Sequence, residues 1–274
     1  MTNIHAGRDL DTSRPHSARM YDYYLGGKDH FPVDKKAAAT VADLYPGIFA
    51  CAGENRKFMH RATRTLAQEY GIRQWLDIGT GIPTEPNLHQ VAQSVAPEAR
   101  VVYADNDPLV LKYAERLMRS TAQGRTAYIE ADATDPKSLL AAVEGADVLD
   151  FDQPIALSLN ALMHFVTDDM DPYGMVAGYL EALPSGSALA LSHVTSDFDP
   201  DVWVKVIDLY VTSGTPAQTR SKEEVARFFG ALDLIEPGIA LAHRWRRPAD
   251  EDADAAGEPT DAEVSMFVGV GIKP

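Results

Sequence analysis

Two glycines follow directly after a short apolar run, in the segment Asp77–Gly81 (DIGTG). Glycine adopts backbone conformations that other residues avoid, and without a side chain it lets a ligand approach the main chain closely. Gly79 and Gly81 would turn the chain toward a helix that begins near Pro86, whose free N–H groups favour an anionic part of a ligand. The pattern predicts a nucleotide-type ligand at the end of a strand, with a ligand-free tight turn as the alternative.

The spacing of this turn distinguishes between classes of nucleotide ligand. The dinucleotide-binding fingerprint has a third glycine at the position of Thr84, which follows Pro83 in this chain. The phosphate-loop pattern that ends in Gly-Lys-Ser or Gly-Lys-Thr does not occur in the sequence. A nicotinamide-dependent oxidoreductase is therefore a disfavoured alternative.

Carboxylates end the next two apolar runs of the chain. The run from Val101 ends at Asp105, and the run from Tyr128 ends at Asp132. An ionised carboxylate only accepts hydrogen bonds, so Asp105 could bind both hydroxyls of a ribose and Asp132 the exocyclic amine of an adenine. Asp107 is expected to cap the helix that follows, and a capping or loop role is the alternative for Asp132.

Two histidines could remove a proton from a bound molecule, because imidazole is the commonest general base. His164 follows the fourth predicted strand and His193 the fifth, and His164 is the preferred candidate. For each, the alternative is a structural histidine bonded to a backbone carbonyl. No metal site is predicted, because His5, His16 and His30 have no cysteine or histidine partners at ligand spacing.

An aromatic segment near the N-terminus could cover such a site. Tyr21, Tyr23 and Tyr24 precede the pair Gly26-Gly27. Aromatic faces attract a sulfonium or another cation by roughly 0.5–2 kcal/mol per contact, and the glycines could form a hinge or approach the ligand. We expect a lid that contacts substrate, with tyrosines that only pack the lid onto the protein as the alternative.

After Gly71, short apolar runs alternate with helical patterns, which favours a mostly parallel sheet with helices on both faces. The predicted strands are Gln74–Ile78, Arg100–Ala104, Thr126–Glu130, Pro154–Leu159, Ser187–Ser192, Leu234–Leu241 and Val264–Ile272. The predicted helices are Pro86–Val95, Pro108–Ser120, Pro136–Ala142, Pro172–Leu183 and Lys222–Leu232, the last preceded by a capping box at Ser221. Residues 71–274 are expected to form this α/β domain.

Residues 1–70 are expected to form a helical N-terminal lid or extension. Residues 36–70 have a helical pattern that Pro46 and Gly47 divide into two pieces. Asn55 and Arg56 lie in the second piece and could bind a carboxylate of the ligand, because the guanidinium group matches a carboxylate in shape. A surface ion pair is the alternative for Arg56.

The chain is acidic, with 40 Asp and Glu against 25 Lys and Arg and a net charge of −15. This charge disfavours nucleic acid and anionic membranes as partners. The basic cluster His243–Arg247 is expected to neutralise the acidic segment Arg247–Glu263, which is predicted to be an exposed loop. The single cysteine, Cys51, and the lack of any long apolar run or signal-peptide core predict a cytoplasmic globular protein; no feature indicates its oligomeric state.

The strand ends at Asp77–Gly81, Asp105 and Asp132 resemble those of the Rossmann-like S-adenosylmethionine-dependent methyltransferases. Other segments resemble the actinobacterial S-adenosylmethionine methyltransferase family that was first catalogued as a domain of unknown function. These segments are Ser13–Asp34, Asn55–Ala62, Gln74–Thr84, Val101–Val110 and Ala161–Asp168. The resemblance covers nearly the whole chain, and the N-terminal block is its family-specific part.

This resemblance implies a seven-stranded sheet whose last strand is antiparallel and lies beside the fifth, and it implies S-adenosyl-L-methionine as the cofactor. The implied contacts are Asp77 at the methionine amino group, Gly79 and Gly81 at the methionine and ribose, Asp105 with the adjacent Asn106 at the ribose, Asp132 with Ala133 at the adenine, and Asn160 and Ala161 beside the methionine moiety. The predicted function is methyl transfer to a small-molecule acceptor, in which positioning supplies much of the rate. A non-catalytic, regulatory protein that binds the cofactor is the main alternative.

Overall fold

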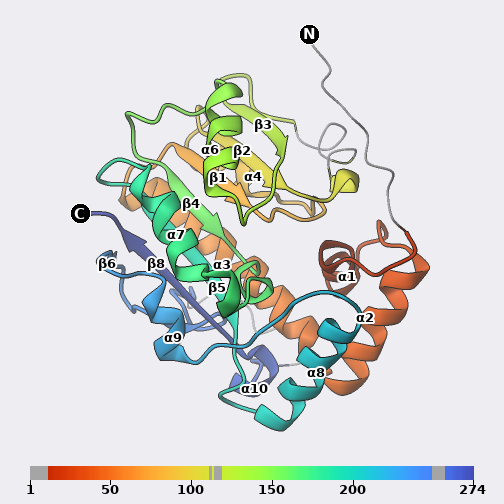
Figure 1. Ribbon diagram of the computed structural model, residues 1–274. Coiled ribbons are helices and arrows are strands. Elements are labelled where there is room, and N and C mark those ends of the chain that lie inside the picture. Colours follow the sequence, from red (N-terminus) through yellow and green to blue (C-terminus); the bar gives the residue numbers. More distant parts are fainter. Residues whose placement is uncertain (1–11, 111–112, 114–118, 249–256) are drawn as a thin grey trace.

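The computed structural model describes residues 12–110, 113, 119–248 and 257–274. At its centre lies a sheet with the strand order β3-β2-β1-β4-β5-β8-β6 (Figure 1). Its strands are β1 (Gln74–Ile78), β2 (Arg100–Asp105), β3 (Arg125–Glu130), β4 (Ala156–Leu159), β5 (Ala188–Val194), β6 (Asp233–Leu234), β7 (Ala240–Leu241) and β8 (Met266–Ile272). Strands β1 to β5 are parallel, and β8 runs antiparallel between β5 and the short strands β6 and β7. The predicted mostly parallel sheet, with an antiparallel last strand beside the fifth, is confirmed.

Side chains of the central strands alternate between two apolar layers, because successive residues of a strand point to opposite faces. In β1, Trp75 packs in one layer, whereas Leu76 and Ile78 pack in the other. Strand β5 is buried along its whole length, as expected for a strand that helices cover on both faces. Each large apolar side chain buried in this way contributes about 1.5–3 kcal/mol, so the sheet is a stable base for the loops at its edge.

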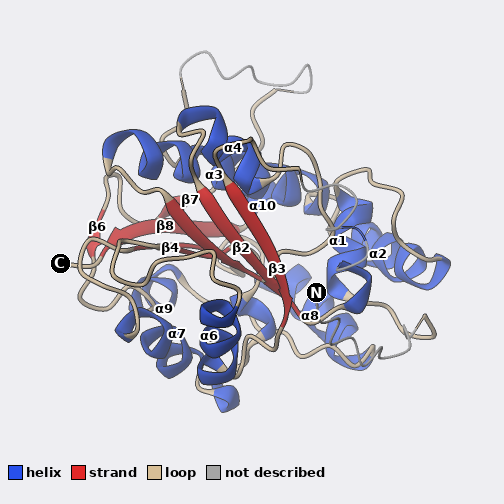
Figure 2. Ribbon diagram, turned by 90° about the horizontal axis from the view of Figure 1, so that it is seen from above, coloured by secondary structure: helices blue, strands red, loops and turns tan. Residues whose placement is uncertain are grey.

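Helices cover both faces of the sheet, as Figure 2 shows. One face is covered by α6 (Pro136–Gly145), α7 (Pro172–Glu181) and α9 (Lys222–Arg227), and the other by α3 (Ile48–Glu69), α4 (Leu88–Val95) and α10 (Asp261–Val264). Beyond the carboxyl ends of the parallel strands lie α1 (Ser17–Tyr24), α2 (Pro32–Leu44) and α8 (Pro200–Thr212). This third group therefore lies where the sheet is expected to bind a ligand.

Helices α6, α7 and α8 each begin at an Asp-Pro pair. The side chains of Asp135, Asp171 and Asp199 accept a hydrogen bond from the backbone N–H three residues later. Such caps satisfy N–H groups that have no partner inside the helix, and proline at the first helical position loses no hydrogen bond. These starts were predicted for α6 and α7 and are confirmed.

Two predicted elements differ from the structure, and a third cannot be compared with it. The strand predicted over Leu234–Leu241 is interrupted, because Pro237 cannot donate a main-chain hydrogen bond and Gly238 turns the chain with a φ of +76°. The sheet therefore has an eighth, short strand. The helix predicted over Lys222–Leu232 ends at Arg227, before Gly230 with a φ of +48°. Most of the helix predicted over Pro108–Ser120 lies outside the described residues.

The first 70 residues fold directly against the sheet. Helix α3 places Phe58 and Leu66 in the same apolar layer as Trp75, and buried Arg61 donates to the carbonyl oxygens of two residues after β7. Helix α2 begins at Pro32, earlier than the predicted helical pattern, and the sequence did not predict the exact extent of α1. The boundary at residue 70 stays a prediction, because α3 on one side of it is also one of the helices that cover the sheet.

The basic cluster His243–Arg247 contacts acidic side chains. Arg244 pairs with Asp261, and Arg247 lies 3.2 Å from Glu258. The prediction that this cluster neutralises the acidic segment is confirmed for these pairs, while residues 249–256 of the segment lie outside the described residues. Surface pairs of this kind contribute about 1 kcal/mol or less each, so they are not a main source of stability.

Candidate active site

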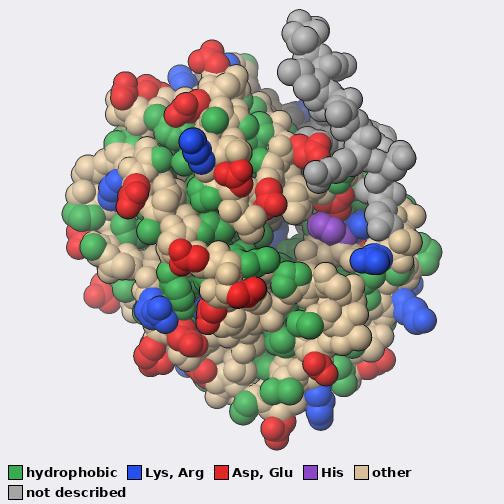
Figure 3. All heavy atoms as spheres, in the orientation of Figure 1, with side chains coloured by type: hydrophobic (Ala, Val, Ile, Leu, Met, Phe, Trp, Pro, Cys, Tyr) green, Lys and Arg blue, Asp and Glu red, His purple; other side chains and the backbone are tan. Residues whose placement is uncertain are grey.

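A cavity of about 240 Å³ lies at the carboxyl ends of the parallel strands, where open α/β sheets bind their ligands. The loops after β1 to β4 form one part of its wall, and helices α1, α3 and α8 form the other. Figure 3 shows a hollow near the middle of one face, with acidic side chains spread around it. The predicted site residues that line the cavity are Tyr21, Tyr24, Arg56, Asp77, Gly79, Gly81, Asp105, Asn106, Asp132, Ala133, Asn160, Ala161 and His164. Tyr23 and His193 do not line it.

The turn after β1 has a backbone conformation that glycine adopts without strain. Gly79 and Gly81 have φ angles of +73° and +67°. A Cβ atom on Gly79 would come within 2.7 Å of Leu162 Cδ1, so the loops after β1 and β4 touch at this point. The Gly81 N–H donates to Asp105 Oδ2 over 2.8 Å. These contacts fix the main chain of the turn against the cavity.

Asp105 ends β2 and is held by main-chain donors. Its Oδ1 accepts from the Asp107 N–H over 2.9 Å, and its Oδ2 accepts from the Gly81 N–H. Burial raises the pKa of Asp105 above its usual value, and the two N–H bonds partly offset this effect. Each oxygen keeps a lone pair that a ligand hydroxyl could use. Asp107 accepts from the Leu109 N–H over 2.9 Å, which confirms its predicted capping role.

Asp77, in β1, is the second carboxylate of the cavity. Its Oδ1 accepts from Ser158 Oγ over 2.6 Å, and Ser158 Oγ accepts from Asn160 Nδ2 over 2.7 Å. Burial raises the pKa of Asp77 to about 6, against the lowering effects of Ser158 and Arg56. Asn160 Oδ1 is buried and has no hydrogen-bond partner among the described residues. A cationic ligand group at this point would satisfy both side chains.

The loops after β3 and β4 complete the strand-end part of the cavity. Ala161 has a φ of +52°, a conformation that costs a non-glycine residue roughly 1–2 kcal/mol, and its N–H donates to Ser192 Oγ over 2.7 Å. Asp132 Oδ1 accepts from both the N–H and the hydroxyl of Thr134, at 2.9 and 2.7 Å. Asp132 is exposed, so its other oxygen is accessible to a ligand, and Ala133 beside it also lines the cavity.

Helix α3 brings Asn55 and Arg56 to the cavity wall. Arg56 Nη2 donates to the carbonyl oxygens of Thr84 and Pro86, so it holds the loop that leads into α4 rather than forming the surface ion pair considered above. Asn55 Nδ2 donates to the Tyr21 hydroxyl over 2.8 Å. This bond joins α3 to α1 across the cavity wall.

Ion pairs fasten α1 over the strand ends. Arg19 Nε lies 3.4 Å from Asp107 Oδ2, and Arg19 Nη1 lies 3.6 Å from Asp34 Oδ2 in α2. His16 Nδ1 lies 3.3 Å from the same Asp107 oxygen. His16 lines the cavity but was not predicted as a site residue; the N-terminal block of the family resemblance, which contains it, was the available signal.

The predicted lid residues occupy different places. Tyr21 and Tyr24 line the cavity, whereas Tyr23 packs edge-on against His30, with 5.4 Å between the ring centroids. Gly27 does not line the cavity, and a Cβ atom there would meet the Asp22 carboxylate at 1.9 Å. Gly27 therefore lets the chain after α1 pass close to the Asp22 side chain of that helix.

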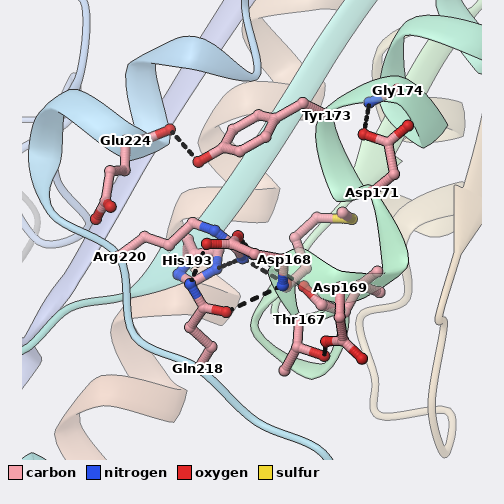
Figure 4. Close-up of polar contacts among 12 residues, drawn as sticks. Thr167, Asp168, Asp169, Asp171, Tyr173, Gly174, His193, Gln218, Arg220 and Glu224 are labelled. Atoms are coloured by element: carbon pink, nitrogen blue, oxygen red, sulfur yellow. Dashed lines mark hydrogen bonds and ion pairs between the residues drawn. The ribbon is translucent and has the colours of Figure 1, made fainter.

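Arg220 is the centre of a buried polar network, drawn in Figure 4. Its guanidinium donates to the carbonyl oxygens of Met163 and Val166, each over 3.0 Å, and to His193 Nε2 over 2.7 Å. Its fourth contact is Asp168 Oδ1 at 2.7 Å. Arg220 therefore holds the segment after β4 against β5, and this segment contains His164.

The two candidate histidines have different environments. His193 is fully buried; its Nδ1 bonds to the carbonyl oxygen of Val194 over 2.7 Å, and its Nε2 accepts from Arg220. This geometry matches the alternative for His193, a structural histidine bonded to a backbone carbonyl. His164 lines the cavity, and its Nδ1 has no hydrogen-bond partner in the described part of the chain. Burial and the nearby Arg220 lower the pKa of His164 to about 3, so the imidazole is neutral and a weak base.

One part of the cavity wall was not predicted from the sequence, apart from the lid residue Tyr24. We call it the apolar chamber; its walls are Tyr24, Ile48, Cys51, Phe165, Trp203, Val206, Ile207, Tyr210 and Met266. These residues come from elements that are far apart in the chain, and each is an ordinary core residue type. No motif or spacing in the sequence marks them as a group.

Comparisons with known proteins agree with this geometry. The model of the S-adenosyl methyltransferase family matches residues 3–274. The crystal structure of a DUF574 family protein from Streptomyces avermitilis has 48% identity, covering 96% of this chain and 99% of that chain with a TM-score of 0.92. A protein from Thermobifida fusca, provisionally assigned as a methyltransferase, has 36% identity, covering 99% of both chains with a TM-score of 0.86. A comparison with curated proteins gave no match.

More distant structures share the fold. Human N-acetylserotonin methyltransferase, crystallised with S-adenosylmethionine, is 14% identical, and the alignment covers 93% of this chain and 70% of that chain with a TM-score of 0.50. The chain therefore belongs to the S-adenosyl methyltransferase family. It is an S-adenosylmethionine-dependent methyltransferase with a Rossmann-like fold, and S-adenosyl-L-methionine is its cofactor. Within the described residues, no helix is both long and apolar enough to cross a bilayer.

Proposed function

We propose that the cavity binds S-adenosylmethionine along the strand ends and that its methyl group passes to a small-molecule acceptor in the apolar chamber. One observation carries this proposal: a single cavity is lined by carboxylates and glycine main chain on one side and by apolar side chains on the other. The first side offers acceptors to the ammonium, ribose hydroxyl and adenine amine groups of the cofactor. The second side has no carboxylate and is mainly apolar, so it suits a different molecule.

The proposed cofactor contacts follow from the donors and acceptors that remain available. Asp105 would accept from the ribose hydroxyls, with Asn106 beside it, and the free oxygen of Asp132 from the adenine amine, with Ala133 beside it. Asp77 and the unpaired Asn160 Oδ1 would accept from the methionine ammonium. Gly79, Gly81 and Ala161 would contact the cofactor through their main chain, and Arg56 would bind its carboxylate with N–H groups that are not used on the loop carbonyls.

The chemistry that the cofactor supplies is a methyl group on a sulfonium; the C–S bond breaks and both of its electrons stay on sulfur. A lone pair of the acceptor atom forms the new bond, and any proton on that atom leaves to solvent or to a base. His164 is the proposed contact for this proton, because it lines the cavity and its Nδ1 has no hydrogen-bond partner among the described residues. A pKa of about 3 favours hydrogen bonding by His164 over strong base catalysis.

Calorimetry with S-adenosylmethionine, S-adenosylhomocysteine and NAD tests the cofactor assignment. Both methionine derivatives should bind and NAD should not; binding of NAD alone would overturn it. Incubation with methyl-labelled cofactor and small-molecule fractions separates an enzyme from a regulatory binding protein. Label in a small product supports catalysis, and cofactor binding without transfer to any chemical class supports the regulatory alternative.

We also propose that the protein acts in the cytoplasm and binds no nucleic acid. The net charge of −15 and the single, buried Cys51 support this proposal. A gel-shift experiment at low salt, where nucleic-acid binding is strongest, should show no complex. A complex that forms at physiological salt would overturn it.

A further inference from the structure

We infer that the methyl acceptor is a neutral, mainly apolar molecule that carries an oxygen able to accept a hydrogen bond. The inference rests on the proposed function, since it assigns the apolar chamber to the acceptor. It excludes amino acids, phosphorylated metabolites, polyamines and other charged molecules from this position.

Charge is divided unequally between the two parts of the cavity. The ionisable side chains at or beside the strand ends are Asp77, Asp105, Asp132, His16 and Arg56. No carboxylate, lysine or arginine side chain is among the described residues that form the apolar chamber. An ion that enters such a space loses its hydration without gaining an opposite charge, which is strongly unfavourable. A charged acceptor would therefore bind poorly there.

The titratable groups of the chamber itself are neutral. Burial raises the pKa of Cys51 to about 12 and that of Tyr210 to about 12. The Tyr24 and Tyr210 hydroxyls lie 3.3 Å apart and form a hydrogen bond with each other. His164 beside them is also neutral. The chamber therefore presents a thiol, two paired hydroxyls and an uncharged imidazole to its ligand.

The walls of the chamber are buried aromatic and aliphatic side chains. Trp203 is 2% exposed, Val206 is fully buried and Met266 is 2% exposed. The Phe165 and Tyr210 rings lie 5.7 Å apart, at the end of the chamber near His164. Surfaces of this kind gain affinity by removing the apolar area of a ligand from water, so they fit an acceptor with an apolar body.

One buried donor of the chamber lacks a partner. Trp203 Nε1 has no hydrogen-bond partner among the residues that the structure describes, and a buried N–H group without a partner is unfavourable until an acceptor binds it. Trp75 and Trp245 also have unpaired Nε1 atoms, but neither lines the cavity. Of the three unpaired indole N–H groups, only that of Trp203 belongs to a residue that lines the cavity, so it is the one assigned to the ligand oxygen.

Four probes that share a benzene ring test this inference on the complex with S-adenosylhomocysteine. They are acetophenone, which is neutral with a carbonyl oxygen; ethylbenzene, which is neutral without one; benzoate, an anion; and benzylamine, a cation at neutral pH. Calorimetry should show acetophenone binding about tenfold more tightly than ethylbenzene. Benzoate and benzylamine should bind at least about tenfold more weakly than acetophenone. Binding of a charged probe as tight as that of acetophenone, or no binding of any probe up to its solubility limit, would overturn the inference.

Two matched variants test the assignment of the donor. Trp203→Phe should abolish the difference between acetophenone and ethylbenzene, whereas Trp245→Phe should keep it, because both lose an unpaired N–H but only one is in the chamber. A difference that persists in Trp203→Phe would overturn the role of Trp203. Should that variant not fold, the ranking of the four probes on the unaltered protein still decides the class of acceptor.

The same samples separate failure of this inference from failure of the proposed function. Binding of S-adenosylhomocysteine is measured first, before any probe is added. If it binds and the charged probes are preferred, the acceptor class is wrong and the cofactor site stands. If it does not bind, the proposed function fails, and the probe ranking on the free protein describes the chamber alone.

Discussion

The strand-end part of the cavity and the apolar chamber are built in different ways. At the strand ends, Asp105 and Asp132 lie within a residue or two of a strand and are held by nearby backbone N–H groups. In the chamber, Tyr24, Trp203 and Met266 come from three distant parts of the chain and meet only through tertiary packing. The proposed cofactor contacts are thus local in the sequence, whereas the proposed acceptor contacts depend on the whole fold. The two parts should respond differently to substitution.

The largest effect is expected at Arg220, which holds the segment that joins the two parts. Arg220→Leu leaves two buried carbonyl oxygens and His193 Nε2 without their donor. Each unsatisfied group costs about 1–3 kcal/mol, so the free energy of unfolding should fall by about 3–5 kcal/mol. Urea unfolding measures this loss.

Arg244→Leu is the matched control, because the Arg244 side chain is 58% exposed and pairs with Asp261 at the surface. Its loss should be about 1 kcal/mol or less. Equal losses in the two variants would contradict a structural role for the Arg220 network. Acceptor-probe binding should weaken more than cofactor binding in Arg220→Leu, because the hydrogen bonds of Arg220 hold the segment that contains His164.

Asp105→Ala should produce the next largest effect, confined to the strand-end part. Loss of a charged acceptor for the ribose hydroxyls should weaken S-adenosylhomocysteine binding by about 1–3 kcal/mol, which corresponds to roughly five- to 150-fold. Calorimetry measures this change, and ethylbenzene binding in the chamber should not change. Asp135→Ala, which removes the α6 cap outside the cavity, is the control. Unchanged cofactor affinity in Asp105→Ala would refute the ribose assignment.

The sequence predicted which strand-end residues line the cavity, because the determinants of this part are short in range. The Asp77–Gly81 pattern, the Asp107 cap and the alternation of strands and helices each depend on neighbouring residues, and the structure has the expected fold. The interruption of the strand predicted over Leu234–Leu241 depends equally on local residues, Pro237 and Gly238, and these were available as a signal.

The apolar chamber could not be predicted, because its residues have no shared spacing. Trp203 and Tyr210 have the same residue types as ordinary core positions, and only the fold places them opposite Tyr24. The sequence favoured His164 over His193, but for the same reason it did not predict the contact that separates them. Arg220, which donates a hydrogen bond to His193 Nε2, is 27 residues away from His193 in the chain.

The pH dependence of ligand binding should also differ between the strand-end part and the apolar chamber. The expected change in affinity is smaller than for the substitutions above. The pKa of Asp77 is about 6 in the folded protein against a usual value of 3.8. Its contribution to stability is therefore fully present below about pH 4 and is lost as the pH rises through about 6. A bound ammonium requires the ionised form, so cofactor affinity should change in the opposite direction.

S-adenosylhomocysteine should bind roughly tenfold more weakly at pH 5 than at pH 7, because the pKa of Asp77 is about 6. Calorimetry at a series of pH values measures this trend. Asp77→Asn should remove it, and ethylbenzene binding in the chamber should be independent of pH over the same range. A pH trend that is unchanged in Asp77→Asn would show that another group titrates.

The smallest effect is expected at His164, where the two parts of the cavity meet. With a pKa of about 3, its imidazole should stay neutral from about pH 5 to pH 8, which nitrogen chemical shifts in ¹⁵N-histidine-labelled protein can measure without knowledge of the acceptor. His164→Gln keeps a hydrogen-bonding group, so methyl transfer should slow by less than about tenfold and keep its pH profile. His60, which bonds to the Pro86 carbonyl and does not line the cavity, provides the control variant His60→Gln. Loss of an inflection between pH 6 and pH 7 in His164→Gln alone would instead identify His164 as a general base whose pKa rises when both ligands are bound.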